Sequence, residues 1–103
     1  MSDIVNVTSV GDAVDNDDIT VDNTTGGVTL LEANPNRKSA LIINTGAEPM
    51  RVTTDDSAPT STHGKLIVAG ASLSLTSPDC PVKKVLAIRG SSSNTTANAS
   101  EVV

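Results

Sequence analysis

His63 is the single histidine of the chain, and it lies among hydroxyl residues in the run 60–64. A histidine acts as the general base for a serine nucleophile when a carboxylate orients the ring. Such serines often occupy a strained Gly-x-Ser-x-Gly turn, and the nearest run here, Gly70–Ser74, lacks the second glycine. The pattern predicts a loop histidine and no catalytic residues.

Acidic residues gather at Asp15–Asp18, where closely spaced oxygen atoms suggest calcium. An EF-hand loop that begins at Asp15 requires Gly at its sixth position and Glu at its twelfth, but Thr20 and Gly26 stand there. A solvated acidic loop is the favoured interpretation, and a loose calcium site shared between subunits is the alternative. Cys80 and His63 together also fall short of the roughly four ligands of a structural zinc site. We expect no metal and no cofactor.

Composition narrows the classes of partner. The chain of 103 residues has a net charge of −5 and contains no Phe, Tyr or Trp. Nucleic-acid backbones attract basic proteins, and single strands and sugars usually stack on aromatic rings. We therefore expect neither a nucleic-acid nor a glycan partner. Seven of the twelve acidic side chains and none of the seven basic ones lie in residues 1–36, which predicts either a solvated acidic arm or a segment that pairs with a neighbouring subunit.

The size of the chain limits it to one domain with a thin aliphatic core. A chain without aromatic residues buries little apolar area in its own core. Packing its apolar faces against further copies of itself would increase that buried area, so we expect an oligomer. The single cysteine gives no internal disulfide, and we recognise neither a signal peptide nor a stretch of transmembrane length. The expected place of synthesis is the cytoplasm, with no membrane partner.

Strand signals dominate from residue 28 onward. The turn Ala33–Arg37 is predicted from Pro35, which lacks an N–H, and from the asparagines beside it. No window has helical periodicity, and Ser72–Thr76 alternates strictly between apolar and polar residues. Short strands with turn signals about every 8–12 residues predict an all-β, antiparallel sandwich or jelly-roll-like domain. The expected strands are 19–21, 28–33, 39–44, 50–54, 65–68, 72–76 and 82–89.

The chain is predicted to have three parts: an acidic N-terminal arm with short strands over 1–27, a β-sandwich core over 28–90, and a tail over 91–103 that consists of a flexible linker and a terminal strand. Residues 90–98 are low in complexity and are predicted to be flexible. Glu101–Val103 is expected to be either a terminal strand that pairs with a neighbouring subunit or a frayed end. Arg37 and Lys38 follow the proline turn, and we expect either surface charges or anchors for a carboxylate at a subunit boundary.

Several runs together resemble small virion proteins of tailed bacteriophages. They are Ala33–Arg37, Leu41–Gly46, Pro49–Val52, Gly70–Leu75 and Val85–Arg89. The resemblance covers about residues 28–90 and is strongest to the β-sandwich decoration, or cement, proteins that sit as trimers on the outside of an icosahedral capsid. These runs are turn and strand signatures and carry no active-site motif.

This resemblance implies a non-enzymatic structural protein that binds the major capsid protein as a homotrimer and stabilises contacts between capsomers in the virion. A tail, baseplate or fibre-associated attachment module is the alternative, and a small hydrolase that uses His63 is a third hypothesis from a different class. We expect the subunit contacts to involve the arm, the residues after the proline turn and the C-terminal end: Ile4, Val5, Val7, Arg37, Lys38, Val102 and Val103.

Overall fold

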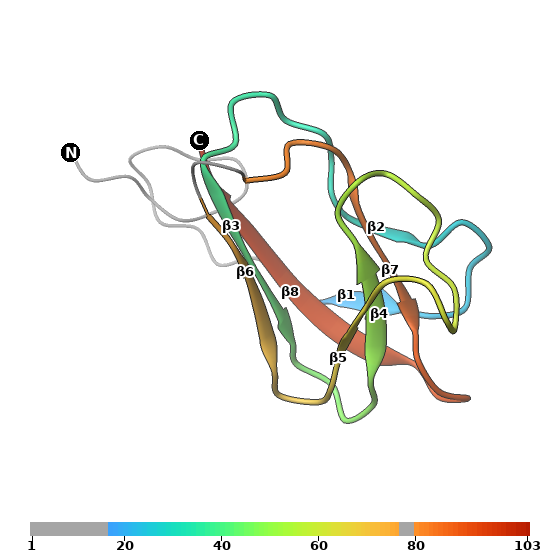
Figure 1. Cartoon of the computed structure of the whole chain (residues 1–103). Coiled ribbons are helices and arrows are strands. Elements are labelled where there is room, and N and C mark those ends of the chain that lie inside the picture. The colour runs from blue at the N-terminus through green and yellow to red at the C-terminus, as the bar shows by residue number, and fades with distance from the viewer. Residues whose placement is uncertain (1–16, 77–79) are drawn as a thin grey trace.

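The computed structural model describes residues 17–76 and 80–103. Within these ranges the chain forms β-strands and no helix, and the strands build two antiparallel sheets of four that face each other (Figure 1). The prediction of an all-β sandwich is confirmed. The strands are β1 (Ile19–Val21), β2 (Val28–Leu31), β3 (Ser39–Asn44), β4 (Met50–Thr53), β5 (Lys65–Ile67), β6 (Ser72–Leu75), β7 (Val85–Arg89) and β8 (Thr95–Val102).

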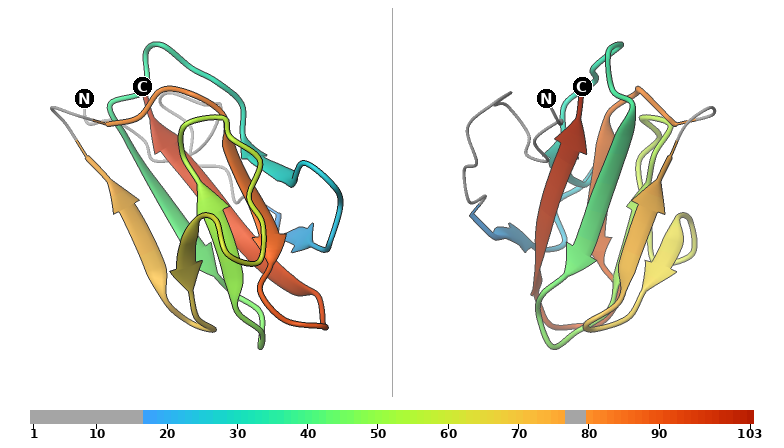
Figure 2. Two further views of the ribbon diagram at one scale, coloured as in Figure 1. Left: turned by 45° about the vertical axis from the view of Figure 1, so that its right-hand side comes forward. Right: turned by 90° about the vertical axis from the view of Figure 1, so that its left-hand side faces the viewer.

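The strand order is that of a jelly roll. Sheet A has the order β1-β8-β3-β6 and sheet B the order β2-β7-β4-β5. The antiparallel pairs β1:β8, β2:β7, β3:β6 and β4:β5 are nested, as if one long hairpin had been rolled into two layers. Figure 2 shows the two layers from the side and sheet A from its face. An eight-stranded double sheet with this nesting is the jelly-roll arrangement.

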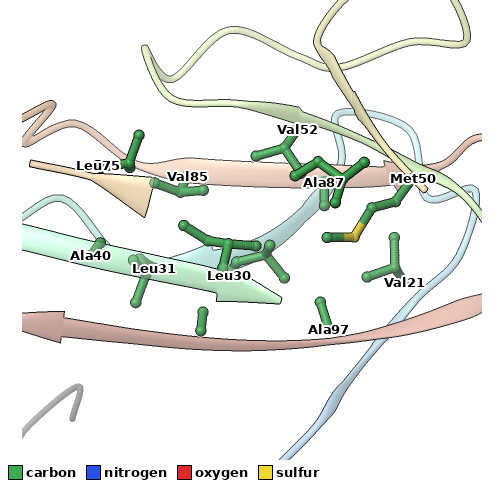
Figure 3. Close-up of a cluster of buried hydrophobic side chains, with 13 residues drawn as sticks. Val21, Leu30, Leu31, Ala40, Met50, Val52, Leu75, Val85, Ala87 and Ala97 are labelled. Carbon is green, nitrogen blue, oxygen red and sulfur yellow. The ribbon is translucent and has the colours of Figure 1, made fainter. Parts of the chain in front are cut away.

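The core lies between the sheets and is aliphatic. Alternate residues of each strand point inward, because successive side chains of a strand face opposite sides. In β3, for example, Ala40 and Ile42 are buried while Leu41 and Ile43 are half-buried on the outer side. Figure 3 shows side chains from both sheets meeting in this layer. Its members are Val21, Leu30, Leu31, Ala40, Ile42, Met50, Val52, Ile67, Leu75, Val85, Ala87, Ala97 and Ala99.

The C-terminal segment corrects the prediction of a flexible stretch over residues 90–98. β8 is the longest strand described, and it lies inside sheet A between β1 and β3. Its burial alternates strictly from Thr95 to Val102, with Ala97 and Ala99 fully in the core. These inward residues are small, so the strand carried no hydrophobic signal. Glu101 and Val102 pair with β3 of the same chain, so they form a strand and not a frayed end.

The sandwich also includes strands from outside the predicted core of 28–90. β1 lies in the predicted arm and β8 in the predicted tail, and the two strands pair with each other in sheet A. The sandwich thus requires residues on both sides of 28–90. The part of the predicted arm that precedes residue 17 lies outside the described residues.

The proline turn forms as predicted, with the Arg37 N–H donating to the Asn34 carbonyl at 3.1 Å. It joins β2 of sheet B to β3 of sheet A, so it carries the chain across the sandwich instead of closing a hairpin. The predicted strand 39–44 has the observed bounds, whereas the strand predicted over 82–89 begins only at Val85.

Part of the outer face of sheet B is covered by its own chain, while Leu66 of β5 stays exposed there. Thr53 and Leu86 pair across β4 and β7 on that face, and both are buried. The β4–β5 loop lies over them, with the Thr53 hydroxyl donating to the Ser57 carbonyl at 2.6 Å and Pro59 buried. Gly27 permits the close approach, because its φ is +88° and a Cβ there would lie 2.8 Å from Pro59.

Among the described residues, the strands of sheet A direct no charged side chain to its outer face, although the Asp18 carboxylate, just before β1, accepts hydrogen bonds there from Asn98 at 3.2 Å and Thr45 at 3.1 Å. The strands of sheet A contain a single charged residue, Glu101, and it points inward. The residues that alternate with the buried ones are hydroxyl, amide and aliphatic. They are Thr20, Ser39, Leu41, Ile43, Ser72, Ser74, Thr96, Asn98, Ser100 and Val102.

Candidate functional site

Arg37 occupies a buried polar cluster at one end of the sandwich. Its Nε lies 2.7 Å from Glu101 Oε1, and the exposed fractions of the two side chains are 0% and 8%. Three of the four remaining guanidinium hydrogens go to backbone carbonyls: Nη1 to Pro81 at 2.9 Å and Lys83 at 3.0 Å, and Nη2 to Glu32 at 2.7 Å. Only arginine offers this many donors in one planar group.

The elements explain why these groups meet. Arg37 directly precedes β3 and Glu101 lies near the end of β8, both in sheet A. The three carbonyls belong to the segments that follow β2 and precede β7, both in sheet B. The guanidinium therefore joins the two sheets. The expectation that Arg37 is a surface charge is wrong, because its side chain is buried, and its carboxylate partner, Glu101, belongs to the same chain.

A second polar cluster surrounds Asn44 at the opposite end of β3. The Asn44 Nδ2 donates to the carbonyls of Glu48 and Ile67, both at 2.8 Å. Its Oδ1 accepts from the Thr95 hydroxyl at 2.9 Å and from the Gly46 N–H at 3.2 Å. The side chain is fully buried and its amide uses both donors and its acceptor, which is the condition for a stable buried amide.

The two clusters hold the same pair of strands. β3 and β8 are antiparallel, so Asn44 meets Thr95 at one end and Arg37 meets Glu101 at the other. Each cluster also reaches sheet B, through Ile67 of β5 at one end and through the segments beside β2 and β7 at the other. Among the described residues no buried side-chain nitrogen or oxygen lacks a hydrogen-bond partner. These polar residues are thus satisfied within the fold.

His63 does form a contact with a serine, which the sequence reasoning did not anticipate. Its Nε2 lies 2.9 Å from Ser57 Oγ, in the β4–β5 loop. The same hydroxyl lies 2.5 Å from Asp55 Oδ1. Hydrogen bonds from the Ser57 hydroxyl, the largest cause, and from the Ser57 backbone N–H lower the pKa of Asp55.

The direction of these hydrogen bonds opposes nucleophilic catalysis. A serine hydroxyl has one proton, and an ionised carboxylate can only accept, so the proton of Ser57 goes to Asp55. His63 then donates to Ser57 through Nε2, whereas a general base must accept the serine proton there. The carboxylate also contacts the serine, while in a triad it would orient the histidine. The arrangement stabilises the loop and does not activate Ser57.

The residues expected at subunit contacts fall into two groups. Ile4, Val5 and Val7 lie outside the described residues. The other four meet at one end of the molecule: Lys38 donates its backbone N–H to the Val102 carbonyl at 2.7 Å, and Val103 lines a shallow hollow together with Asn34–Lys38. Lys38 is exposed, and Val102 and Val103 are half-buried.

The part of the chain that the structure describes can be compared with the requirements of a metal site and of a reactive thiol. There, no group of three His, Cys, Asp or Glu side chains is placed to hold a metal ion. Asp15 and Asn16 of the proposed calcium loop lie outside that part. Cys80 is free and half-buried, and burial raises the pKa of its thiol, which disfavours the reactive thiolate.

One further finding concerns membranes. Over residues 17–76 and 80–103, no helix is both long and apolar enough to cross a bilayer.

The feature left as a candidate functional site is the outer face of sheet A. Leu41 and Ile43 lie in its middle, flanked by Ser74 and Ser72 on β6 and by Ser100 and Asn98 on β8. Such a surface can bury area without removing charges from water, which is the costly step in forming a contact. In the sequence, this face corresponds to four strands that contain no Lys, Arg or Asp. The pattern could not be recognised without knowing that β8 is a strand and that these four strands form one sheet.

Comparison of this chain with models of known protein families, with curated proteins and with solved structures found no match.

Proposed function

We propose that this protein is a structural virion protein that decorates the capsid of a tailed bacteriophage. In this proposal it binds the major capsid protein on the outer capsid surface as a homotrimer and stabilises the contacts between capsomers. It works without catalysis or cofactor and joins the virion after synthesis in the host cytoplasm. The runs that resemble decoration proteins are the origin of the proposal, and the fold is compatible with it.

The observation that supports this function best is that the strands of sheet A direct only uncharged side chains to its outer face. A cement protein requires contact area and repeated weak contacts, and it requires no reactive group. Leu41, Ile43 and Val102 provide apolar area on that face, and the serine hydroxyls around them provide hydrogen-bonding groups. The other face of the sandwich is partly covered by the β4–β5 loop.

Three-fold symmetry would raise the affinity for the capsid even if each subunit buries only a small surface. Three identical contacts to one local three-fold axis act as a linked set, so the overall affinity exceeds that of each contact by orders of magnitude. Jelly rolls occur in viral capsid domains and also in lectins and cupins, so the fold by itself is compatible with more than one function.

The test is the copy number of this chain in purified phage particles, measured by quantitative mass spectrometry against the major capsid protein. The proposal predicts a ratio near one to one. A few copies per particle would instead assign the protein to the tail, baseplate or a fibre. Absence from the particles would refute a virion role.

The oligomeric state gives an independent check. The molar mass of the purified protein in solution, measured by light scattering, is expected near three times 10.5 kDa. A stable monomer at micromolar concentration would contradict the homotrimer.

A further inference from the structure

Four strands form the edges of the two sheets: β1 and β6 in sheet A, and β2 and β5 in sheet B. Proteins protect such edges against other chains by short strands, charges, prolines or bulges. β1 has three residues and is flanked by Asp18 and Asp22, and β5 also has three and begins with Lys65. β2 has a register shift between Thr29 and Leu31.

β6 has none of these devices. It has the sequence Ser-Leu-Ser-Leu and pairs with β3 in unbroken register over all four residues. The chain around it is uncharged from Leu66 to Pro78. In the right-hand view of Figure 2, β6 closes sheet A on the side opposite β1. Among the described residues, no strand pairs with its far side.

The backbone groups that face this open edge can be identified. The Thr45 N–H donates to Thr96 of β8, and the Asn44 N–H donates to Ala71 beside β6. Because these directions alternate along a strand, the even residues of β3 bond to β6. Leu73 and Leu75 are the partners of Ile42 and Ala40, so Ser72 and Ser74 direct their N–H and C=O groups to the open edge.

We propose that the segment Ile4–Val10 of a second copy of this chain adds to β6 as a further strand of sheet A. The segment reads Ile-Val-Asn-Val-Thr-Ser-Val, which is rich in β-branched residues and contains no charge, Gly or Pro. An uncharged edge accepts an uncharged strand without desolvating an ion. The inference rests on the proposed homotrimer and assigns Ile4, Val5 and Val7 their contact.

The length and origin of the segment favour a neighbouring copy. Residues 11–16 separate it from Asp17 and extend to about 20 Å at most. The chain enters sheet A at β1, and a strand added beyond its own β6 would lie four strand spacings, or about 19 Å, from β1. Reaching its own edge would therefore require these six residues to cross the face of the sheet almost fully extended. A contact from the β1 side of one copy to the β6 edge of the next is head-to-tail, and such contacts form a ring when the rotation between copies closes, as the proposed trimer requires.

Residue-resolved hydrogen exchange of the full-length protein tests this. The Ser72 and Ser74 amides are expected to exchange at least about tenfold more slowly than in the variant Val7→Pro, whose proline removes a donor from the added strand. Leu73 and Leu75 bond to β3 and stay protected in both proteins. Ala13→Pro, in the connecting residues, is the matched control and should retain the slow exchange.

Fast exchange of Ser72 and Ser74 in the unaltered protein would overturn the inference. So would protection that survives Val7→Pro, or protection that persists after dilution to monomers, which would mean that each chain covers its own edge. The variant Ser74→Pro removes an outward N–H without breaking the pairing with β3, and we expect it to convert the trimer to a folded monomer.

The failure of this inference and that of the proposed function are distinguishable. An exposed β6 edge in a protein present at one copy per capsid protein would refute the strand addition alone. A protected edge in a protein that is absent from particles would refute the virion role alone.

Discussion

The two polar clusters at the ends of β3 achieve the same result with different chemistry. At one end an ion pair, Arg37–Glu101, connects the sheets, and at the other a neutral amide, Asn44, does so. Both are buried, and each is satisfied partly by nearby residues and partly by groups far away in the sequence. The comparison shows that the buried charged and amide side chains of both clusters stabilise the fold by connecting its two sheets.

The difference between the clusters lies in what happens when one partner is lost. Removing one member of a buried ion pair leaves a charge in a medium that solvates it poorly. Removing a neutral amide leaves unpaired dipoles, which cost less. The charged end should therefore be more sensitive to single substitutions than the neutral end.

The largest effect is expected for Arg37→Met, which removes the guanidinium and leaves the Glu101 carboxylate buried without its partner. We expect a loss of about 3–5 kcal/mol in the free energy of unfolding, measured by urea denaturation. The matched control is Lys84→Met, because Lys84 pairs with Glu32 at 3.9 Å while both side chains are substantially exposed. That change should cost less than about 1 kcal/mol.

The double variant Arg37→Met/Glu101→Leu sharpens the point. It removes the unpaired charge along with the pair, so we expect it to be more stable than Arg37→Met alone. A double variant less stable than the single one would show that the cluster acts mainly through the carbonyls of Glu32, Pro81 and Lys83.

At the neutral end, Asn44→Leu keeps the approximate volume and removes the amide. We expect a loss of about 2–3 kcal/mol, because the groups bonded to Asn44 lose their partner in a buried place. Asn36→Leu, at an exposed turn position, is the control and should change the stability by less than about 0.5 kcal/mol. An equal loss in both variants would contradict the role of the cluster.

A smaller effect is expected from Gly46→Ala beside the same cluster. A Cβ at this position would lie 2.0 Å from Thr95 Oγ1 and 2.6 Å from the Thr96 nitrogen, so β8 would have to shift. We expect a loss of about 1–3 kcal/mol. At Gly90 the nearest atoms lie at 3.3 Å, so Gly90→Ala should lower the melting temperature less than Gly46→Ala does.

The smallest effect concerns the exposed Asp55. Hydrogen bonds from Ser57 lower its pKa below the ordinary value of 3.8, so its contribution to stability is present above that value and is lost as the pH falls through the folded-state pKa. Ser57→Ala should raise the pKa of Asp55 toward 3.8, as followed by NMR titration. An unchanged pKa would mean that the hydroxyl is not its main cause.

The sequence predicted the fold class and most of the strands, because β3 contains a short apolar run next to turn signals and β6 has clear apolar alternation. It failed at β8, where the inward residues are Thr95, Ala97, Ala99 and Glu101. Small and charged inward residues produce no alternation of apolar and polar residues along β8. The pattern that was present is an alternation of alanine with larger polar residues in the middle of the strand, which is a difference in side-chain size.

The clusters were less predictable than the strands. Arg37 and Glu101 are 64 residues apart, and Asn44 and Thr95 are 51 apart. Each residue looks ordinary locally: Arg37 follows a turn, and Asn44 precedes one. Their burial depends on the nested strand order, which local patterns do not determine. The contact of His63 with Ser57 likewise depends on how the β4–β5 loop folds back on itself.

The central claim is that the outer surface of sheet A, and not the reactive-looking residues, carries the function. It is tested most directly by comparing the particle occupancy of Ile43→Lys and His63→Ala, both checked first for native unfolding curves. We predict that His63→Ala retains its copy number, while Ile43→Lys, which places an ammonium group in the middle of the uncharged face, loses at least about tenfold in occupancy. Full occupancy of Ile43→Lys together with loss of His63→Ala from particles would contradict the account.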